Sequence, residues 1–436
     1  MYEQTFGGFC MKHGGSRPGS GRNAIQGREI RIKVPDQVFE QLDLFFPGKT
    51  AQERIRECLE YGLKHKGREN LNTGELQLNV IDLFSGAGGL SRGFMDAGFN
   101  VVLGIDFDDA ALKTFKENHG DADIMKLDLF NHNNLRYITD YLDDRNIKVD
   151  VLIGGPPCQG YSLAGPRDEH DERNTLYEAM VKFANMTKPK VVVLENVPGL
   201  LKLFDGKGAQ RIVDDFTDLG YKMQEKILYA PDYGVPQIRK RVFFVGALPE
   251  YGNFEYPIPF VEPENYITCE QAIGDLPSLE DDLGTEVSEY SSKPETMYEE
   301  LMRTNSDKLY NHVGTQHEQK TIDLIAMVPE GKNFRSLPEP YNKMFKYNEA
   351  LTRYHSKRPS LTINTGHRSH FHYKWNRIPT VRESARLQSF PDDFIFYGNK
   401  SQQYRQVGNA VPPLLGKAVG LQVKQLLSKV EETINV

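Results

Sequence analysis

The sequence predicts an α/β fold in which a largely parallel sheet is covered by helices. Five short runs rich in β-branched residues have the composition of buried strands, and helix-length stretches lie between them. Alternating strands and helices need crossover connections, which favour parallel pairing. A Gly-rich turn directly after the first run is the third observation, because open α/β sheets bind ligands at such turns.

The expected elements follow one another in a regular order. The strands are NVIDLF (79–84), VVLGID (101–106), VDVLIGG (149–155), VVVLENV (191–197) and VFFVGA (242–247). Helix-length stretches occupy residues 109–118 and 174–186. Pro-rich segments at 256–263 and 337–340 frame a less regular region. We therefore expect a second, smaller domain there, after which the chain returns to the first domain at about residue 377.

Composition restricts the class of protein. The chain has 436 residues, a formal charge of −7 and a mean hydropathy of −0.53, without an apolar run long enough to cross a membrane. The first residues resemble no export signal, so we expect a cytoplasmic protein. The four cysteines are widely spaced, which argues against a disulfide framework and against a metal site. A functional cysteine would therefore act as a thiol.

The charges are distributed unevenly, and the total conceals two opposing segments. Residues 280–300 carry eight acidic side chains and one Lys, whereas residues 343–377 carry eight basic side chains and one Glu. The second segment also contains interleaved His, Tyr, Phe and Trp residues, a composition suited to phosphate contacts and base stacking. A solvated basic face would have the same composition, so charge alone leaves both interpretations open.

The segment DLFSGAGGLSRGF (82–94) passes from a strand through a Gly-rich turn into a helix. Gly86 and Gly88 allow a ligand to approach the backbone, and Asp106 ends the next strand, where such folds hold a ribose. The pair indicates a nucleoside-type cofactor. Asp128, in KLDLF after another expected short strand, would hold an adenine amino group or serve as a helix cap or turn residue.

The segment GGPPCQGYS (154–162) presents Cys158 after two prolines at the end of a strand. Prolines stiffen the loop, which favours a positioned nucleophile over a buried, inert cysteine. In LENVPG (194–199), Glu195 follows a buried run and is either a functional acid or part of an ion pair.

Two further segments carry polar side chains at regular positions. In PQIRKRVFFVG (236–246), Gln237, Arg239 and Arg241 alternate and should project from one face, where they would clamp an anion or orient a carboxylate. In RQVGNAVPP (405–413), Gly408 and Asn409 are expected to open the last helix.

Together and in this order, these motifs resemble those of the DNA (cytosine-5)-methyltransferases. The resemblance covers residues 79–275 and 377–425 and includes RESARLQSFPDDF (382–394). It implies a Rossmann-like, S-adenosylmethionine-dependent methyltransferase domain at 76–275 plus 377–436. The target-recognition domain would then occupy 276–376.

The resemblance also assigns roles to single residues. Cys158 would add as a thiolate to C6 of a flipped-out cytosine, so that C5 can attack the methyl group of S-adenosylmethionine. Glu195 would hold N3 and the exocyclic amine of the base. Arg241 would contact the base carbonyl or orient Glu195, with Arg239 and Gln237 in support.

Two larger sets follow from the same resemblance. The expected cofactor residues are Phe84, Ser85, Gly86, Gly88, Asp106, Phe107, Asp128, Leu129, Pro156 and Asn409. The candidates for phosphate or base contacts in the recognition region are Arg353, Lys357, Arg358, Arg368 and Lys374.

The N-terminal extension, residues 1–75, resembles a ribbon-helix-helix DNA-binding domain. REIRIKVP (28–35) alternates like a strand, and two amphipathic stretches follow it. That fold requires a homodimer, in which Arg31 and Lys33 would enter the major groove. A small helical appendage packed on the enzyme is the alternative.

The sequence thus favours an enzyme that methylates a specific double-stranded DNA sequence in a bacterial restriction-modification or orphan modification system. It would act at the nucleoid, and its N-terminal extension would bind its own promoter operator. The alternatives are a tRNA cytosine-5 methyltransferase and a transcription regulator with a relic enzyme fold.

Overall fold

The computed structural model describes residues 77–157, 176–343, 350–366 and 369–434. The N-terminal extension lies outside the described residues, and so do the predicted site residues Cys158, Arg368, Arg31 and Lys33.

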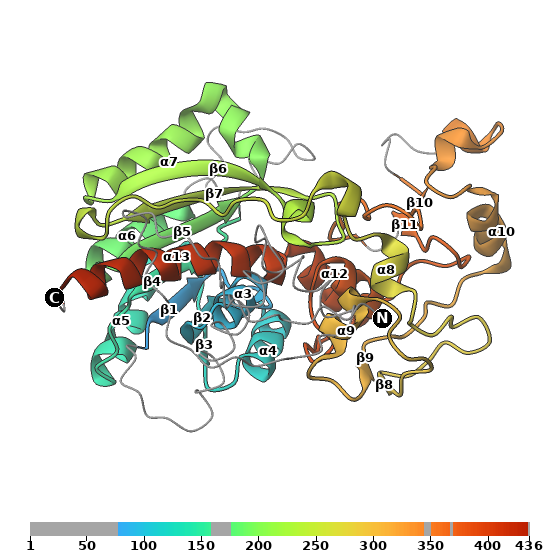
Figure 1. Cartoon of the computed structure of the whole chain (residues 1–436), viewed down its shortest axis with the longest axis horizontal. Coiled ribbons are helices and arrows are strands. Elements are labelled where there is room, and N and C mark those ends of the chain that lie inside the picture. Colours follow the sequence, from blue (N-terminus) through green and yellow to red (C-terminus); the bar gives the residue numbers. More distant parts are fainter. Residues whose placement is uncertain (1–76, 158–175, 344–349, 367–368, 435–436) are drawn as a thin grey trace, which may run out of the picture. The chain divides into compact units, whose positions relative to one another are not determined.

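A seven-stranded sheet forms the centre of the larger part of the described chain (Figure 1). Its strands are β1 (Asn79–Leu83), β2 (Asn100–Asp106), β3 (Asp123–Lys126), β4 (Val151–Gly154), β5 (Val191–Asn196), β6 (Lys222–Tyr229) and β7 (Lys240–Ala247). They are ordered β3-β2-β1-β4-β5-β7-β6. The first five are parallel, whereas β7 runs antiparallel to both β5 and β6. The predicted α/β class with a largely parallel sheet is confirmed.

All five expected strands are present, and β3 and β6 join them. β3 is the short strand expected before Asp128. β6 was not predicted, because its sequence KMQEKILY has no β-branched run and most of its side chains are partly or fully exposed. Charged side chains suit an edge strand, because they discourage pairing with another chain.

Helices cover both faces of the sheet (Figure 1). They are α3 (Gly89–Asp96), α4 (Asp109–Asn118), α5 (Leu135–Asp144), α6 (Tyr177–Thr187), α7 (Lys207–Asp218) and α13 (Pro413–Ile434). The helix expected at 109–118 is confirmed, and the Asp108 side chain caps it by accepting hydrogen bonds from the backbone N–H groups of Ala110 and Ala111. The described part of 174–186 lies within α6, apart from Leu176, which precedes this helix.

The sheet is buried on both faces. Val80 and Val151 belong to one core with side chains of α3 and α13, and Ile81 and Leu152 belong to another with side chains of α5, α6 and α7. Strands buried on both sides need apolar side chains in both directions, which explains why their sequences are continuous hydrophobic runs. Gly93 permits the close approach of α3 and α13, because a Cβ there would lie 2.5 Å from the Lys417 backbone nitrogen.

The remaining elements lie outside this sheet (Figure 1). They are α8 (Cys269–Ile273), α9 (Met297–Arg303), α10 (Gln319–Met327), α11 (Val381–Leu387), α12 (Lys400–Asn409), and the short strands β8 (Val287–Ser288), β9 (Leu309–Tyr310), β10 (Thr352–Arg353) and β11 (His370–Phe371). β8 pairs antiparallel with β9, and β10 pairs parallel with β11.

Two clusters of buried side chains organise these elements. The first combines Ala272 and Tyr298 with Ala385 and Tyr404, so it draws on residues before, within and after the expected recognition domain. The second is smaller and is centred on α10, Phe334, Phe371 and Ile378. The acidic segment therefore packs against the C-terminal part of the chain, separately from the second cluster.

One predicted helix boundary is wrong. Gly408 and Asn409 are the last two residues of α12, and the last helix begins at Pro413. The two prolines that follow Val411 explain the break: the residue before a proline disfavours helical geometry, and proline itself is suited to the first turn of a new helix.

Candidate active site

The Gly-rich turn and Asp106 form one hydrogen-bonded unit at the carboxyl ends of β1 and β2. The backbone N–H of Gly86 donates to Asp106 Oδ2 at 2.8 Å, and the backbone N–H groups of Phe107 and Asp108 donate to Oδ1 at 2.7 and 3.0 Å. Burial raises the pKa of Asp106, while these three N–H groups counteract the shift. The turn and the expected ribose acid are thus brought together, as the sequence predicted.

The turn has a strained backbone that closely fits its surroundings. Phe84, Gly86 and Gly88 have φ angles of 63°, 53° and 90°. A Cβ on Gly88 would lie 2.2 Å from Cε1 of His119, which fills the space behind the turn. Glycine is therefore required at this position both for its φ angle and for its lack of a side chain.

His119 supports the turn from α4's C-terminal end. Its Nε2 lies 3.0 Å from the carbonyl oxygen of Gly88, its Nδ1 lies 2.7 Å from that of Phe115, and its ring stacks on the Phe115 ring. Burial lowers the pKa of His119 to about 4, so the ring is neutral at pH 7. The role of His119 was not predicted, because a histidine after a helix carries no recognisable signal in the sequence.

The other expected cofactor residues occupy the same edge of the sheet. Phe107 directly follows β2 and is 67% exposed, which leaves its ring face available for stacking. Asp128 is exposed two residues after β3, and its Oδ1 accepts a hydrogen bond from the Phe130 N–H, so it is a turn residue with an accessible carboxylate. Leu129 is buried in the core beside it.

Glu195 and Arg241 form a buried ion pair at the ends of neighbouring strands β5 and β7. Arg241 Nε lies 2.8 Å from Glu195 Oε1, and the two side chains are only 14% and 11% exposed. Burial raises the pKa of Glu195, against the attraction of Arg241 and Arg239. The structure thus contains an ion pair at Glu195, which is one of the two alternatives left open by the sequence, while burial shifts the pKa of this carboxyl upward.

The loop that leads toward Cys158 starts beside this carboxylate. Gly155 follows β4, and a Cβ on it would lie 3.3 Å from Glu195 Oε2. Asn196 donates a hydrogen bond from Nδ2 to the carbonyl oxygen of Pro156 at 3.1 Å. The described chain thus reaches the Glu195 carboxylate three residues before Cys158, which itself lies outside the described residues.

Gln237 and Arg239 alternate with exposed residues, as predicted, but both are engaged inside the protein. Arg239 is 1% exposed, and its guanidinium donates to the carbonyl oxygens of Ile363, Gly408 and Ala410 at 3.0 to 3.2 Å. Gln237 is fully buried and donates to Gln388. Arg239 and Gln237 therefore connect β7 to two segments distant in the sequence, one at Ile363 and the other at 388–410.

These contacts join the recognition region and the C-terminal region to β7. Ser360 and Gln237 form a parallel bridge, and Ile238 N–H donates to the Ser360 carbonyl at 2.8 Å. A Cβ on Gly408 would lie 2.4 Å from the Asn364 carbonyl oxygen, so the two backbones touch there. Asn409 is exposed next to this junction. The role of segment 360–364 could not be inferred from its sequence, because it has no distinctive composition.

The basic candidates of the recognition region separate into two groups. Lys357, Arg358 and Lys374 are exposed, and Lys374 lies over the Trp375 ring at 4.5 Å. Arg353 is different, because it is 5% exposed and its guanidinium donates to four backbone carbonyl groups and to the Asn376 side chain. This arrangement contradicts the expectation of a DNA contact at Arg353, whose side chain instead holds α10 against β11.

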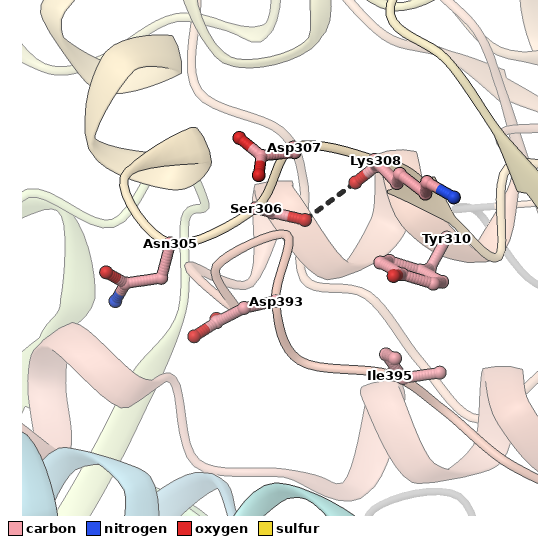
Figure 2. Close-up of a pocket in the computed structure, with 7 residues that line it drawn as sticks. All are labelled: Asn305, Ser306, Asp307, Lys308, Tyr310, Asp393 and Ile395. Atoms are coloured by element: carbon pink, nitrogen blue, oxygen red, sulfur yellow. Dashed lines mark hydrogen bonds between the residues drawn. The ribbon is translucent and has the colours of Figure 1, made fainter.

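A surface cavity of about 380 Å³ is shown in Figure 2. It is lined by Asn305, Ser306, Asp307, Lys308, Tyr310, Asp393 and Ile395. Ser306 Oγ donates to the Lys308 carbonyl oxygen at 2.6 Å, as Figure 2 shows. None of the expected catalytic or cofactor residues lines this cavity.

Within the described ranges, no group of three or more His, Cys, Asp or Glu side chains is arranged to hold a metal ion. No helix in the described part of the chain is both long and apolar enough to cross a membrane.

Comparisons with known proteins agree with one another. A family model described as C-5 cytosine-specific DNA methylase matches residues 78–425. The type II methyltransferase M.DdeI of Desulfomicrobium norvegicum is 37% identical over 379 residues, which span 79% of this chain and 88% of that protein. The type II methyltransferase M1.HphI of Haemophilus parahaemolyticus is 37% identical over 357 residues, covering 80% of this chain and 88% of that protein.

A solved structure has the same fold. It is assigned as a DNA modification methyltransferase encoded within a prophage in E. coli, and it is 25% identical to this chain with a TM-score of 0.66. The match covers 80% of this chain and 99% of that structure.

Proposed function

The chain belongs to the C-5 cytosine-specific DNA methylase family, and we propose that it methylates a cytosine in duplex DNA through a Cys158 adduct supported by Glu195 and Arg241. The enzyme is an S-adenosylmethionine-dependent DNA methyltransferase. One observation carries the proposed roles: the buried Glu195–Arg241 pair lies against the start of the loop that leads to Cys158.

The residues of the Gly-rich turn fit a nucleoside-containing methyl donor. Asp82 Oδ1 and Ser85 Oγ, on either side of Phe84, are buried and have no hydrogen-bond partner among the described residues. A Cβ on Gly86 would meet nothing within 4 Å, so the turn is open to a ligand at that residue. In our proposal, the ribose is held by Asp106, the adenine by Phe107, Asp128 and Leu129, and the methionine end by Asn409. When bound, S-adenosylmethionine supplies an electrophilic methyl group on a sulfonium.

The chemistry of the proposed reaction follows from the paired groups. The Cys158 thiolate forms a bond to C6 of the cytosine, and the electron pair displaced from the C5–C6 bond is then available at C5 for bonding to the methyl carbon. Glu195 donates a proton or hydrogen bond to N3, which is the site where negative charge develops. Loss of the C5 proton to a base then expels the Cys158 thiolate and restores the aromatic ring.

The charge balance of the site suits this role. Arg239 and Arg241 both act on the Glu195 carboxylate, and although burial lowers the pKa of both guanidinium groups, arginine keeps its charge in proteins. The site therefore remains cationic even when Glu195 is ionised. Net positive charge in a buried site stabilises a nucleophilic thiolate and a developing anion on the base. Arg241 would contact the base carbonyl or hold Glu195, while Arg239 and Gln237 would keep the surrounding segments in place.

For DNA recognition, we propose the region 276–376, in which the second hydrophobic cluster supports a smaller recognition lobe. Its exposed candidates are Lys357, Arg358 and Lys374, with Arg368 added from the sequence alone. A cytosine inside a duplex is inaccessible, so the target must be flipped out. With DNA as its substrate, the protein would be found at the bacterial nucleoid, in a restriction-modification or orphan modification system.

The N-terminal extension adds a separate proposal, which depends on its sequence alone. In a ribbon-helix-helix homodimer, Arg31 and Lys33 would read operator DNA at the protein's own promoter. Deletion of residues 1–75 should abolish promoter binding and leave methyl transfer unchanged. Promoter binding that survives the deletion would contradict this proposal.

The enzymatic proposal is tested by transfer of a tritiated methyl group to duplex DNA and to tRNA. We expect transfer to duplex DNA and none by Cys158→Ala, while Cys10→Ala, which removes a different thiol, should act like the parent protein. Transfer to tRNA alone, or full activity of Cys158→Ala, would overturn the proposal. Bisulfite sequencing of DNA from cells that express the protein would then identify the methylated sites.

A further inference from the structure

Asp82 is an ionisable residue inside the apolar strand β1, and none of the roles described above uses its ionisation. Its side chain is 1% exposed, and Oδ2 accepts a hydrogen bond from Ser91 Oγ of α3 at 2.6 Å. Its other oxygen, Oδ1, is buried and has no hydrogen-bond partner among the residues that the structure describes. Ser85 Oγ, three residues further along the chain, is a second buried atom that lacks a partner within the described part of the chain.

The position of Asp82 connects it with the cofactor site. It lies two residues before Phe84, where the strained turn begins, and it pairs with Gly104 of β2, two residues before Asp106. The negative charge of Asp106 acts on Asp82, so the two carboxyl groups are close enough to influence each other. Asp106 is the proposed ribose ligand. Asp82 is therefore within electrostatic reach of the site where the cofactor is expected to bind.

No cationic side chain neutralises Asp82 in the described surroundings. From β2, Asp106 adds a like charge, and the paired residues of β4 contribute no titratable side chain. From α3, Ser91 donates its hydroxyl, while Arg92 is bonded to Asp96 and Asp393.

His119, which lies behind the turn, leaves this balance unchanged, because its ring is neutral at pH 7. α13 packs on α3 at Gly93, where its basic residue Lys417 contributes a backbone nitrogen. The groups that act on the pKa of Asp82 are Ser91 and Asp106. A buried carboxylate in such surroundings costs several kcal/mol unless a cation comes close.

Burial, with a smaller contribution from Asp106, raises the pKa of Asp82 to about 8. The carboxyl group is therefore mostly protonated at pH 7 in the protein without ligand. In both the protonated and the ionised form, Oδ1 has no hydrogen-bond partner among the described residues. Among these residues, the ionised form also has no positive charge close to it. A positively charged ligand is the partner that would favour the ionised form.

We propose that Asp82 is a charge-selective group of the cofactor site, which gives up its proton when the cationic methyl donor binds and thereby favours the donor over the neutral product. This inference rests on the proposed function. The donor carries a sulfonium charge, and methyl transfer converts that sulfonium to an uncharged thioether. The product therefore lacks the charge that stabilises ionised Asp82. The carboxyl takes up a proton again, and Asp82 then adds nothing to the affinity for the product.

The direction of the pH effect follows from linkage. Below pH 8, donor binding must displace the Asp82 proton, so donor affinity rises with pH and levels off above about 8. Product affinity should stay nearly constant over the same range. Because the pKa is raised by folding, the unliganded protein should also lose stability as pH rises through about 8, and the donor should restore it.

The test is calorimetric titration of the full-length protein with S-adenosylmethionine and with S-adenosylhomocysteine, in two buffers of different ionisation enthalpy at about pH 7. We expect the donor to release close to one proton and the product almost none. Asp82→Asn should abolish this release and reduce the preference for donor over product by about tenfold. Asp123→Asn makes the same chemical change at the first residue of β3, away from the carboxyl ends of the strands. It should change neither the proton release nor the preference for donor over product.

A second variant keeps the carboxyl group and protects the test against misfolding. Ser91→Ala removes the hydrogen bond that lowers the pKa of Asp82, so the pH at which donor affinity levels off should rise. Equal proton release with both ligands, or an equal loss of both affinities in Asp82→Asn, would overturn the inference and leave Asp82 as a structural residue. Failure of the protein to bind either ligand would instead contradict the proposed function.

Discussion

Glu195→Gln gives the sharpest test of the proposed catalytic pair, because the change preserves the shape of the side chain and removes its acidity. In the parent protein, Arg241 Nε lies 2.8 Å from Glu195 Oε1. With about 4 Å between the charge centres and an effective dielectric constant of about 20, their attraction is about 4 kcal/mol. Glutamine loses this attraction and leaves the Arg241 charge without its partner.

The expected effect on rate is larger than the effect on binding. A positioned general acid contributes roughly 10²- to 10⁴-fold. We therefore expect single-turnover methyl transfer to fall by about that factor in Glu195→Gln, equivalent to about 3–5 kcal/mol in the barrier. Duplex binding, measured by fluorescence anisotropy, should change by less than about tenfold, because the DNA contacts proposed for the recognition lobe remain.

The pH dependence separates an acid from a merely structural group. Because burial raises the pKa of Glu195, the parent enzyme should keep its activity toward higher pH and lose it as Glu195 gives up its proton. This alkaline loss should be absent from the residual activity of Glu195→Gln. Glu225→Gln, on the exposed strand β6, is the matched control. A rate within about threefold of the parent and an unchanged pH profile would refute the acid role.

Three further predictions concern stability, cofactor binding and DNA binding. His119→Ala removes the hydrogen bond to the Gly88 carbonyl oxygen, which we take to contribute about 1.4 kcal/mol to the shape of the turn. The variant should therefore bind S-adenosylmethionine about tenfold more weakly by calorimetry, and an unchanged affinity would contradict this role of His119. Arg353→Ala should reduce the free energy of unfolding in urea by about 3 kcal/mol, because several buried carbonyl groups lose their donor. Lys357→Ala should leave stability unchanged and lower the salt dependence of duplex binding. The reverse pattern would indicate that Arg353 contacts DNA. In α11, the fully buried Arg386 forms ion pairs with Asp275 and Asp392. Arg386→Met leaves both carboxylates without this partner and should cost about 3–5 kcal/mol in the same urea assay, and a loss below about 1 kcal/mol would show that the two ion pairs are dispensable.

Much of the fold could be predicted because its signals are local. The five expected strands are buried on both faces, so each forms a continuous apolar run that is visible without neighbours. Edge strand β6 has one row of partners and exposed charges, so its sequence does not differ clearly from a loop or helix surface. The break before α13 could have been inferred from Pro412 and Pro413, whose effect on helices is also local.

The sequence by itself indicated the family and its methyl-transfer chemistry, because Asp106, Cys158 and Glu195 each stand at or just beyond the end of a recognisable strand. Parallel strands bring their carboxyl ends to one edge, which is why motifs far apart in the chain could be expected to meet there. The tertiary structure alone decided how the arginines are used. The buried Arg353 donates hydrogen bonds to four backbone carbonyl groups, and the buried Arg239 donates to carbonyl groups more than 120 residues away in the sequence, while Lys357 remains exposed. An arginine in the sequence is the same residue whether it contacts DNA phosphates or donates to buried carbonyl groups. Only the acceptors that folding brings close to its guanidinium distinguish these two uses.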